Sequence, residues 1–230
     1  MGFFYYDATM LLILPAFVMA IWAQSRVKST YRRYSQVRSS RGVAGADIAR
    51  EILQRNGLSN VGVEEVPGVL SDHYDPRSRT VRLSTDNFRN PSLAALAVAA
   101  HECGHAIQHA TGYAPLRWRH TILPAANLGS GWMVWVLVMA GLFFSYPPLV
   151  DAGILFFAGA VVFHIVTLPV EFNASSRALA ILSNGGYLVG DENDGARKVL
   201  NAAAMTYVAS AAMAVLQLAR LLILRSSMRD

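Results

Sequence analysis

The chain has 230 residues, of which 53% are hydrophobic and only 15% are charged, and its formal net charge is +5. An ordinary soluble domain carries about 25% charged residues, so this composition excludes such a domain and indicates membrane segments. The basic residues lie beside the apolar runs, which is typical of membrane orientation and not of nucleic-acid binding. The single cysteine, Cys103, excludes an internal disulfide framework.

The first apolar run, Ala8 to Ala23, carries no charge and follows four aromatic residues at positions 3–6. Together they reach the roughly 20 residues that a spanning helix needs. The alternative is a secretory signal peptide, but such peptides begin with positive residues, whereas here Arg26 and Lys28 come afterwards. The pattern favours a retained anchor over residues 1–24, with the N-terminus outside and the following segment in the cytoplasm.

Residues 25–120 are predicted to form a water-soluble cytoplasmic region. Apolar periodicity predicts a helix within Gly42 to Gly57 and an Ala-rich helix from Ser92 to His109. Alternating residues between them predict two or three short strands, with a turn at Asp75-Pro76 before a strand at Thr80 to Ser84. We expect that last strand at a sheet edge, either binding an extended peptide or guarded by its arginines.

Two further apolar runs, Ile122 to Tyr146 and Ala152 to Val170, predict a helical hairpin over residues 121–170. Their connection, Pro147 to Asp151, lacks Lys and Arg, whereas basic residues flank the outer ends of the pair. Both ends of the hairpin are therefore predicted to face the cytoplasm. A fourth run, Ala202 to Ala219, contains polar residues and precedes arginines, so the sequence leaves three or four spans open.

The Ala-rich helix carries the sequence His101-Glu102-Cys103-Gly104-His105. Residues four apart share a helix face, so both imidazoles can reach one Zn²⁺, with Glu102 beside it as general base for the attacking water. The motif arises by chance in roughly one chain of this length in a hundred, so it needs its helical context, which is present here. We therefore predict that His101 and His105 bind zinc.

A catalytic zinc usually has three protein ligands. His109 lies about 12 Å from His101 along a straight helix axis, too far to share one ion, and Thr111 stands where the metzincin spacing needs a histidine. Glu171 ends the second hairpin helix, where a carboxylate is costly without a cation. From the residues alone, a zinc ligand and a water-solvated glutamate are equally good interpretations of Glu171.

The segment H-E-C-G-H-A-I-Q-H, preceded by S-D-H-Y-D-P and followed by E-F-N-A-S-S-R-A, resembles the YugP-type neutral zinc metallopeptidases of bacterial membranes. More distantly, H-E-x-x-H followed by E-x-x-A resembles the HtpX-like and CAAX prenyl proteases. This resemblance implies His101, His105 and Glu171 as zinc ligands and Glu102 as base. The distant relatives usually have Asp at the position of Ser175, which leaves Ser175 as a hydrogen-bond donor here.

Five other residues have a functional and a plainer interpretation. Tyr74 or His73 would stabilise the oxyanion of the tetrahedral intermediate, or belong to an Asp-Pro turn, which we favour. His164 and Arg177 would contact the site, or contact a neighbouring helix and lipid headgroups respectively. Cys103 points away from the two histidines and is expected to be a buried structural thiol.

These patterns together predict a mainly α membrane protein with a small β-sheet, a gluzincin-like metallopeptidase core and three or four transmembrane helices. The predicted function is a multi-pass, zinc-dependent endopeptidase of the cell membrane whose active site faces the cytoplasm. Its expected partners are a membrane-associated peptide or protein substrate and the lipid bilayer, and not nucleic acid. The alternative is a catalytically silent zinc-binding scaffold or chaperone-like factor. The predicted segments are an anchor at 1–24, the metallopeptidase region at 25–120, a hairpin at 121–170, and a third-ligand helix with an apolar helix at 171–230.

Overall fold

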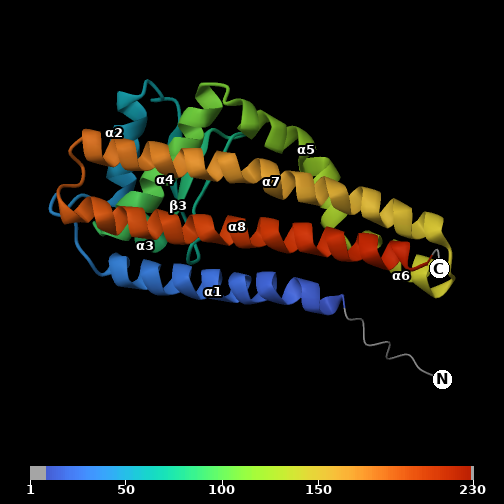
Figure 1. Cartoon of the computed structure of the whole chain (residues 1–230). Coiled ribbons are helices and arrows are strands. Elements are labelled where there is room, and N and C mark those ends of the chain that lie inside the picture. Colours follow the sequence, from blue (N-terminus) through green and yellow to red (C-terminus); the bar gives the residue numbers. More distant parts are fainter. Residues whose placement is uncertain (1–8, 229–230) are drawn as a thin grey trace. The chain divides into compact units, whose positions relative to one another are not determined.

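The computed structural model describes residues 9–228, so residues 1–8 of the predicted anchor, which include the aromatic residues at positions 3–6, lie outside it. The described chain is mostly helical with one three-stranded sheet, which confirms the predicted fold class (Figure 1). Its elements, in chain order, are α1 (Met10–Ser35), α2 (Gly45–Arg55), β1 (Gly62–Val66), β2 (His73–Asp75), β3 (Thr80–Ser84), α3 (Thr85–Arg89), α4 (Leu93–Ala110), α5 (Ala114–Ser130), α6 (Trp132–Phe143), α7 (Pro147–Asn184) and α8 (Asp191–Ser226).

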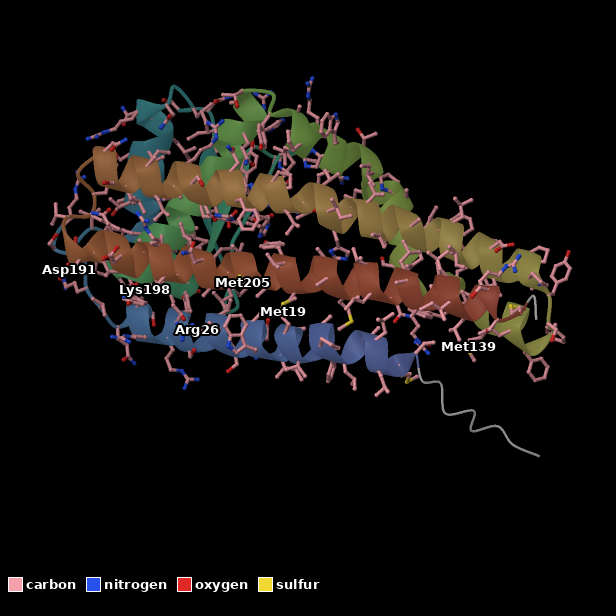
Figure 2. All side chains as sticks on the ribbon, in the orientation of Figure 1. Met19, Arg26, Met139, Asp191, Lys198 and Met205 are labelled. Carbon is pink, nitrogen blue, oxygen red and sulfur yellow. The ribbon has the colours of Figure 1, made fainter. Side chains whose placement is uncertain are left out.

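The described residues divide into two compact units. The apolar unit contains the residues up to Ala23, residues 117–168 and those from Thr206 onward; the sheet unit contains residues 24–116 and 169–205. Four helices, α1, α5, α7 and α8, have residues in both units. Along α1, for example, the apolar stretch that holds Met19 is followed by Arg26 (Figure 2).

Three helices are long and apolar enough to cross a membrane, namely α1, α7 and α8. The pair α5 and α6 would make a fourth span, but it is bent by 46°. The single helix predicted from Ile122 to Tyr146 is therefore wrong, because Gly131 is extended, with φ −74° and ψ 164°. Gly129, beside the bend, packs so closely on α7 that a Cβ there would lie 2.1 Å from the carbonyl oxygen of Phe156.

The predicted connection Pro147 to Asp151 belongs to the first turn of α7, where proline is tolerated because the N–H of that residue needs no helical partner. The undecided fourth run lies within α8, which passes the length and composition test for a span. In the apolar unit, Arg225 near the end of α8 donates to Asp151 near the start of α7 at 2.6 Å. This ion pair offsets the charge of Arg225, one of the arginines that made the run a doubtful span.

The core of the sheet unit surrounds α4. Ser92 caps this helix by accepting a hydrogen bond from the Ala95 N–H at 3.2 Å. Most α4 residues are buried, and its alanines pack with Ile48 and Ile52 of α2 and with Leu182 of α7. A helix that is apolar on every face is buried by its neighbours, so its few polar side chains must find partners inside the fold.

The sheet has the order β1-β3-β2, with β1 parallel and β2 antiparallel to β3. The strand from Thr80 to Ser84 is therefore central, and both predictions that placed it at an edge are wrong. Its alternate residues Val81 and Leu83 are fully buried, which a central strand requires. Arg82, expected to guard an edge, instead forms ion pairs with Glu64 of β1 at 3.2 Å and with Asp75 of β2 at 3.0 Å.

Candidate metal centre

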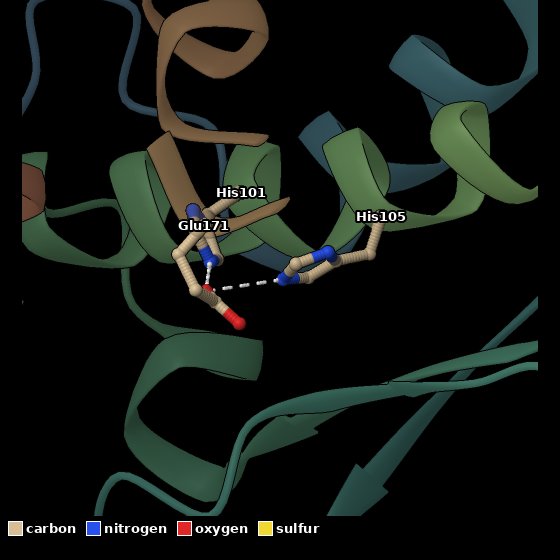
Figure 3. Close-up of side chains that lie close together, drawn as sticks. All are labelled: His101, His105 and Glu171. Atoms are coloured by element: carbon tan, nitrogen blue, oxygen red, sulfur yellow. Dashed lines mark ion pairs between the residues drawn. The ribbon is translucent and has the colours of Figure 1, made fainter. Parts of the chain in front are cut away.

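His101 and His105 lie one turn apart on α4, and Glu171 reaches both of them from α7 (Figure 3). The Oε2 atom of Glu171 lies 3.3 Å from Nε2 of His101 and 3.5 Å from Nε2 of His105. All three side chains are largely buried, and that of Glu171 is only 3% exposed. Of the two interpretations of Glu171, the solvated glutamate is therefore wrong.

Glu171 reaches the histidines because the backbones of α4 and α7 pack in contact. A Cβ added at Gly104 would lie 2.8 Å from the carbonyl oxygen of Ala174, closer than a real side chain can approach. Gly104 sits between the two histidines in sequence, and Ala174 lies three residues after Glu171, on the same side of α7. The glycine of the motif therefore permits the close approach that brings the three candidate ligands together.

A second layer of hydrogen bonds orients the two imidazoles. Nδ1 of His101 lies 3.2 Å from Ser175 Oγ, so Ser175 makes a hydrogen bond to the site as the sequence suggested. Nδ1 of His105 lies 3.0 Å from Gln108 Oε1. Partners on Nδ1 fix the ring orientation and leave Nε2 of both rings for a metal.

Gln108 also connects the motif helix to α7. Its side chain is fully buried, and its Nε2 donates to the Val170 carbonyl at 2.8 Å and to Asn173 Oδ1 at 3.0 Å. Arg177 donates to the same Asn173 oxygen at 2.8 Å. Arg177 thus contacts the site through Asn173, an interaction that the sequence left open.

Two imidazoles and one carboxylate form a donor set that suits a catalytic zinc. Two ligand atoms about 2.0–2.1 Å from a tetrahedral ion lie about 3.3–3.4 Å apart, and the measured nitrogen–oxygen distances are 3.3 and 3.5 Å. The three groups are the described residues whose ligand atoms converge in this way, all within 4.8 Å of one another. The residues therefore fit zinc, and a divalent cation would stabilise the buried carboxylate.

Glu102 is the other buried carboxylate on α4, with 7% exposure. Burial raises the pKa of Glu102, and the nearby carboxylates of Glu171 and Asp72 add to this, while His101 and His105 oppose it. Burial lowers the pKa of His105, but its hydrogen bond to Glu171 and the charge of Glu102 outweigh that effect, so the net shift is upward. A carboxyl group with a raised pKa is suited to accept and return a proton near neutral pH.

The polar residues before β3, Asp72 to Asp75, make mainly structural contacts, as the plainer interpretation predicted. Asp75 accepts hydrogen bonds from the Arg77 backbone N–H, from Ser78 and from Arg82, and these lower the pKa of Asp75 to about 2. Asp72 accepts from the Ser84 N–H at 2.7 Å. His73 is exposed, with Nδ1 2.8 Å from the Ser71 carbonyl oxygen.

The remaining sequence candidates lie outside the triad. His109 makes a hydrogen bond of 2.8 Å through Nδ1 to the Tyr74 hydroxyl, so both side chains are engaged with each other. His164 belongs to the apolar unit and lines a cavity of about 420 Å³ there. Cys103 is fully buried, with its Sγ 3.6 Å from the Ala49 carbonyl oxygen, which confirms a structural thiol.

Sequence reasoning missed Gln108 and Asn173. The signal for Gln108 was its spacing, because a residue three positions after a ligand lies on the same helix face. Asn173 gave no comparable signal, since its role depends on how α7 packs against α4.

The geometry agrees with comparisons to known proteins. A family model described as "Putative neutral zinc metallopeptidase" matches residues 9–226. "Putative membrane protease YugP" of Bacillus subtilis (strain 168) is 45% identical over 219 residues, which are 95% of this chain and 97% of that protein. No solved structure matches the chain. The comparisons confirm the resemblance to the YugP-type proteins.

Gly104→Ala should weaken zinc binding by at least about tenfold, because the new methyl group forces α7 and Glu171 away from the histidines, and overpacking costs about 1–3 kcal/mol. Zinc affinity is measured for the detergent-purified chain by competition with a chelating dye. Gly62→Ala is the matched control, since its Cβ would lie an ordinary 3.5 Å from Thr80. Unchanged affinity in Gly104→Ala would contradict the close-packing argument.

Gln108→Leu should lower zinc affinity about 10- to 100-fold, the usual effect of removing a hydrogen bond that orients a ligand. The same competition assay measures it, with circular dichroism to show that the fold is retained. Gln54→Leu on the exposed side of α2 is the control and should bind zinc like the wild type. Equal affinities of Gln108→Leu and wild type would show that His105 needs no orienting partner.

Proposed function

Because the chain belongs to the neutral zinc metallopeptidase family, we propose that it is a zinc-dependent endopeptidase of the membrane, with His101, His105 and Glu171 as ligands and Glu102 as general base. One observation carries the proposal. Two imidazoles and a carboxylate converge in a buried site, beside a second buried carboxylate whose pKa is raised. A structural zinc site needs no such additional base.

The side chains have separate tasks in peptide hydrolysis. A Zn²⁺ ion held by the triad would lower the pKa of a coordinated water to about 7 and polarise the substrate carbonyl. Glu102 accepts a proton from the attacking water as the new carbon–oxygen bond forms. It then delivers that proton to the amide nitrogen, which leaves as an amine when the carbon–nitrogen bond breaks. The raised pKa of Glu102 assists both transfers.

Two residues beside the triad support this chemistry without touching the reacting atoms. Ser175 and Gln108 hold the two imidazoles through Nδ1, so the rings keep one orientation throughout the reaction. Catalytic groups held within a fraction of an ångström by neighbouring packing need no reorganisation when charge develops.

The membrane setting indicates the class of substrate. Arg26, Lys28, Arg32 and Arg33 follow the apolar stretch of α1, which supports a site that faces the cytoplasm. Three to four candidate spans support a multi-pass protein of the cell membrane. The substrate would accordingly be a peptide or protein held in or near the membrane.

Glu102→Gln should keep one zinc per chain and lose casein cleavage by about 10²- to 10⁴-fold, because an amide cannot carry the proton. The readouts are metal content and casein cleavage of detergent-purified protein. Glu64→Gln is the control, a 60% exposed carboxylate on β1, and it should cleave casein like the wild type. Equal activity of Glu102→Gln and wild type would remove Glu102 from the mechanism and favour a zinc-binding scaffold.

A further inference from the structure

A cavity of about 300 Å³ adjoins the motif helix within the sheet unit. Leu58, Val61 and two alanines of α4 form its apolar wall. Its polar wall is formed by Asn60, Tyr74, Arg79 and His109. A concave site with apolar walls and a few convergent polar groups is the usual form of a ligand site, and nothing in the proposed chemistry uses this one.

The cavity lies on the side of α4 that carries Glu102. Ala106 and His109 come four and seven residues after Glu102, which places all three side chains on one helix face. Ala106 and His109 lie about 6 and 10 Å along the helix axis from Glu102, at 1.5 Å per residue. An extended peptide advances about 3.3 Å per residue. A substrate cleaved beside Glu102 would therefore reach the cavity with a residue two or three positions from the cleaved bond.

Arg79 gives the cavity a positive charge that no ion pair among residues 9–228 neutralises. Arg82 and Arg89 of the same region form ion pairs with Glu64, Asp75 and Glu65. Among the residues that the structure describes, the exposed guanidinium of Arg79 has no such partner. Arg79 also has φ +51°, a left-handed backbone conformation that glycine or asparagine usually adopts. An arginine at this position brings its charge to the cavity at a conformational cost.

The other polar groups of the cavity can also contribute to binding an anion. The Tyr74 hydroxyl and the His109 ring are joined by a hydrogen bond of 2.8 Å, which holds both at the wall. Asn60 adds an amide that can donate. A guanidinium binds a carboxylate through two parallel hydrogen bonds, and this geometry is selective for that group. The apolar wall suits the methylene stem of an acidic side chain.

We propose that this cavity is a specificity subsite that binds a carboxylate of the substrate, with Arg79 as the residue that selects it. The inference rests on the proposed peptidase function and deepens it by naming a substrate class: peptides with a carboxylate two or three residues from the cleaved bond. The carboxylate belongs either to an aspartate or glutamate side chain or to the free C-terminus of the peptide.

The test compares cleavage of paired synthetic peptides by detergent-purified wild type, Arg79→Gln and Arg79→Glu. One set of pairs exchanges Glu for Gln or Lys at each position near the cleaved bond, and another exchanges a free C-terminus for an amide. Wild type should prefer the carboxylate by about tenfold at one position. Arg79→Gln should lose that preference, and Arg79→Glu should favour Lys there. Arg77→Gln is the matched control, an exposed arginine of the same turn outside the cavity, and should keep the wild-type preference.

Each outcome separates this subsite from the proposed function. If only amidation of the C-terminus slows cleavage by the wild type, the subsite binds the C-terminal carboxylate. If exchange of Glu for Gln slows cleavage, the subsite binds a side-chain carboxylate. Cleavage by wild type with no preference for either carboxylate overturns the subsite and leaves the peptidase intact. If no peptide is cleaved, the peptidase function fails, and fluorescence anisotropy of the labelled peptides on Glu102→Gln decides the subsite. Equal binding of acidic and amide peptides to Glu102→Gln overturns the proposed subsite.

Discussion

The contact between the backbones of α4 and α7 at Gly104 and Ala174 is the constraint on which the candidate metal centre depends. It allows Glu171 to lie 3.3 and 3.5 Å from two imidazoles that a different helix supplies. It also brings Gln108 within reach of Val170 and Asn173, so the packing that assembles the ligands also orients one of them. Local helix geometry positions the histidines, and tertiary packing completes the site.

Burial determines the chemical roles of the two carboxylates at the site. Two carboxylates, Glu102 and Glu171, lie inside the protein beside two histidines, where an uncompensated charge is costly. The site resolves this in two ways: Glu171 lies between the imidazoles at a spacing that fits a cation, whereas the pKa of Glu102 is raised by burial. The same surroundings thus favour one carboxylate as a ligand and the other as a proton carrier.

Local signals in the sequence predicted most of the fold and half of the site. Spacing identified the motif helix, the Asp75 turn and the short strands, because neighbours along the chain determine these features. Long-range packing decided what was missed: Thr80 to Ser84 lies at the centre of its sheet, and Gly131 breaks a predicted span. Glu171 stayed ambiguous by composition because only packing of α7 on α4 distinguishes a ligand from a solvated glutamate. Arg79 gave no sequence signal, since its cavity gathers residues from four separate segments.

X-ray absorption at the zinc edge of the detergent-purified protein tests the central claim most directly, because it reports the atoms that surround the metal. The account predicts one zinc with two imidazole nitrogens and further oxygen ligands, all at about 2.0–2.2 Å, and no sulfur at about 2.3 Å. A sulfur ligand, a third imidazole or a protein that binds no zinc would contradict the assignment of His101, His105 and Glu171.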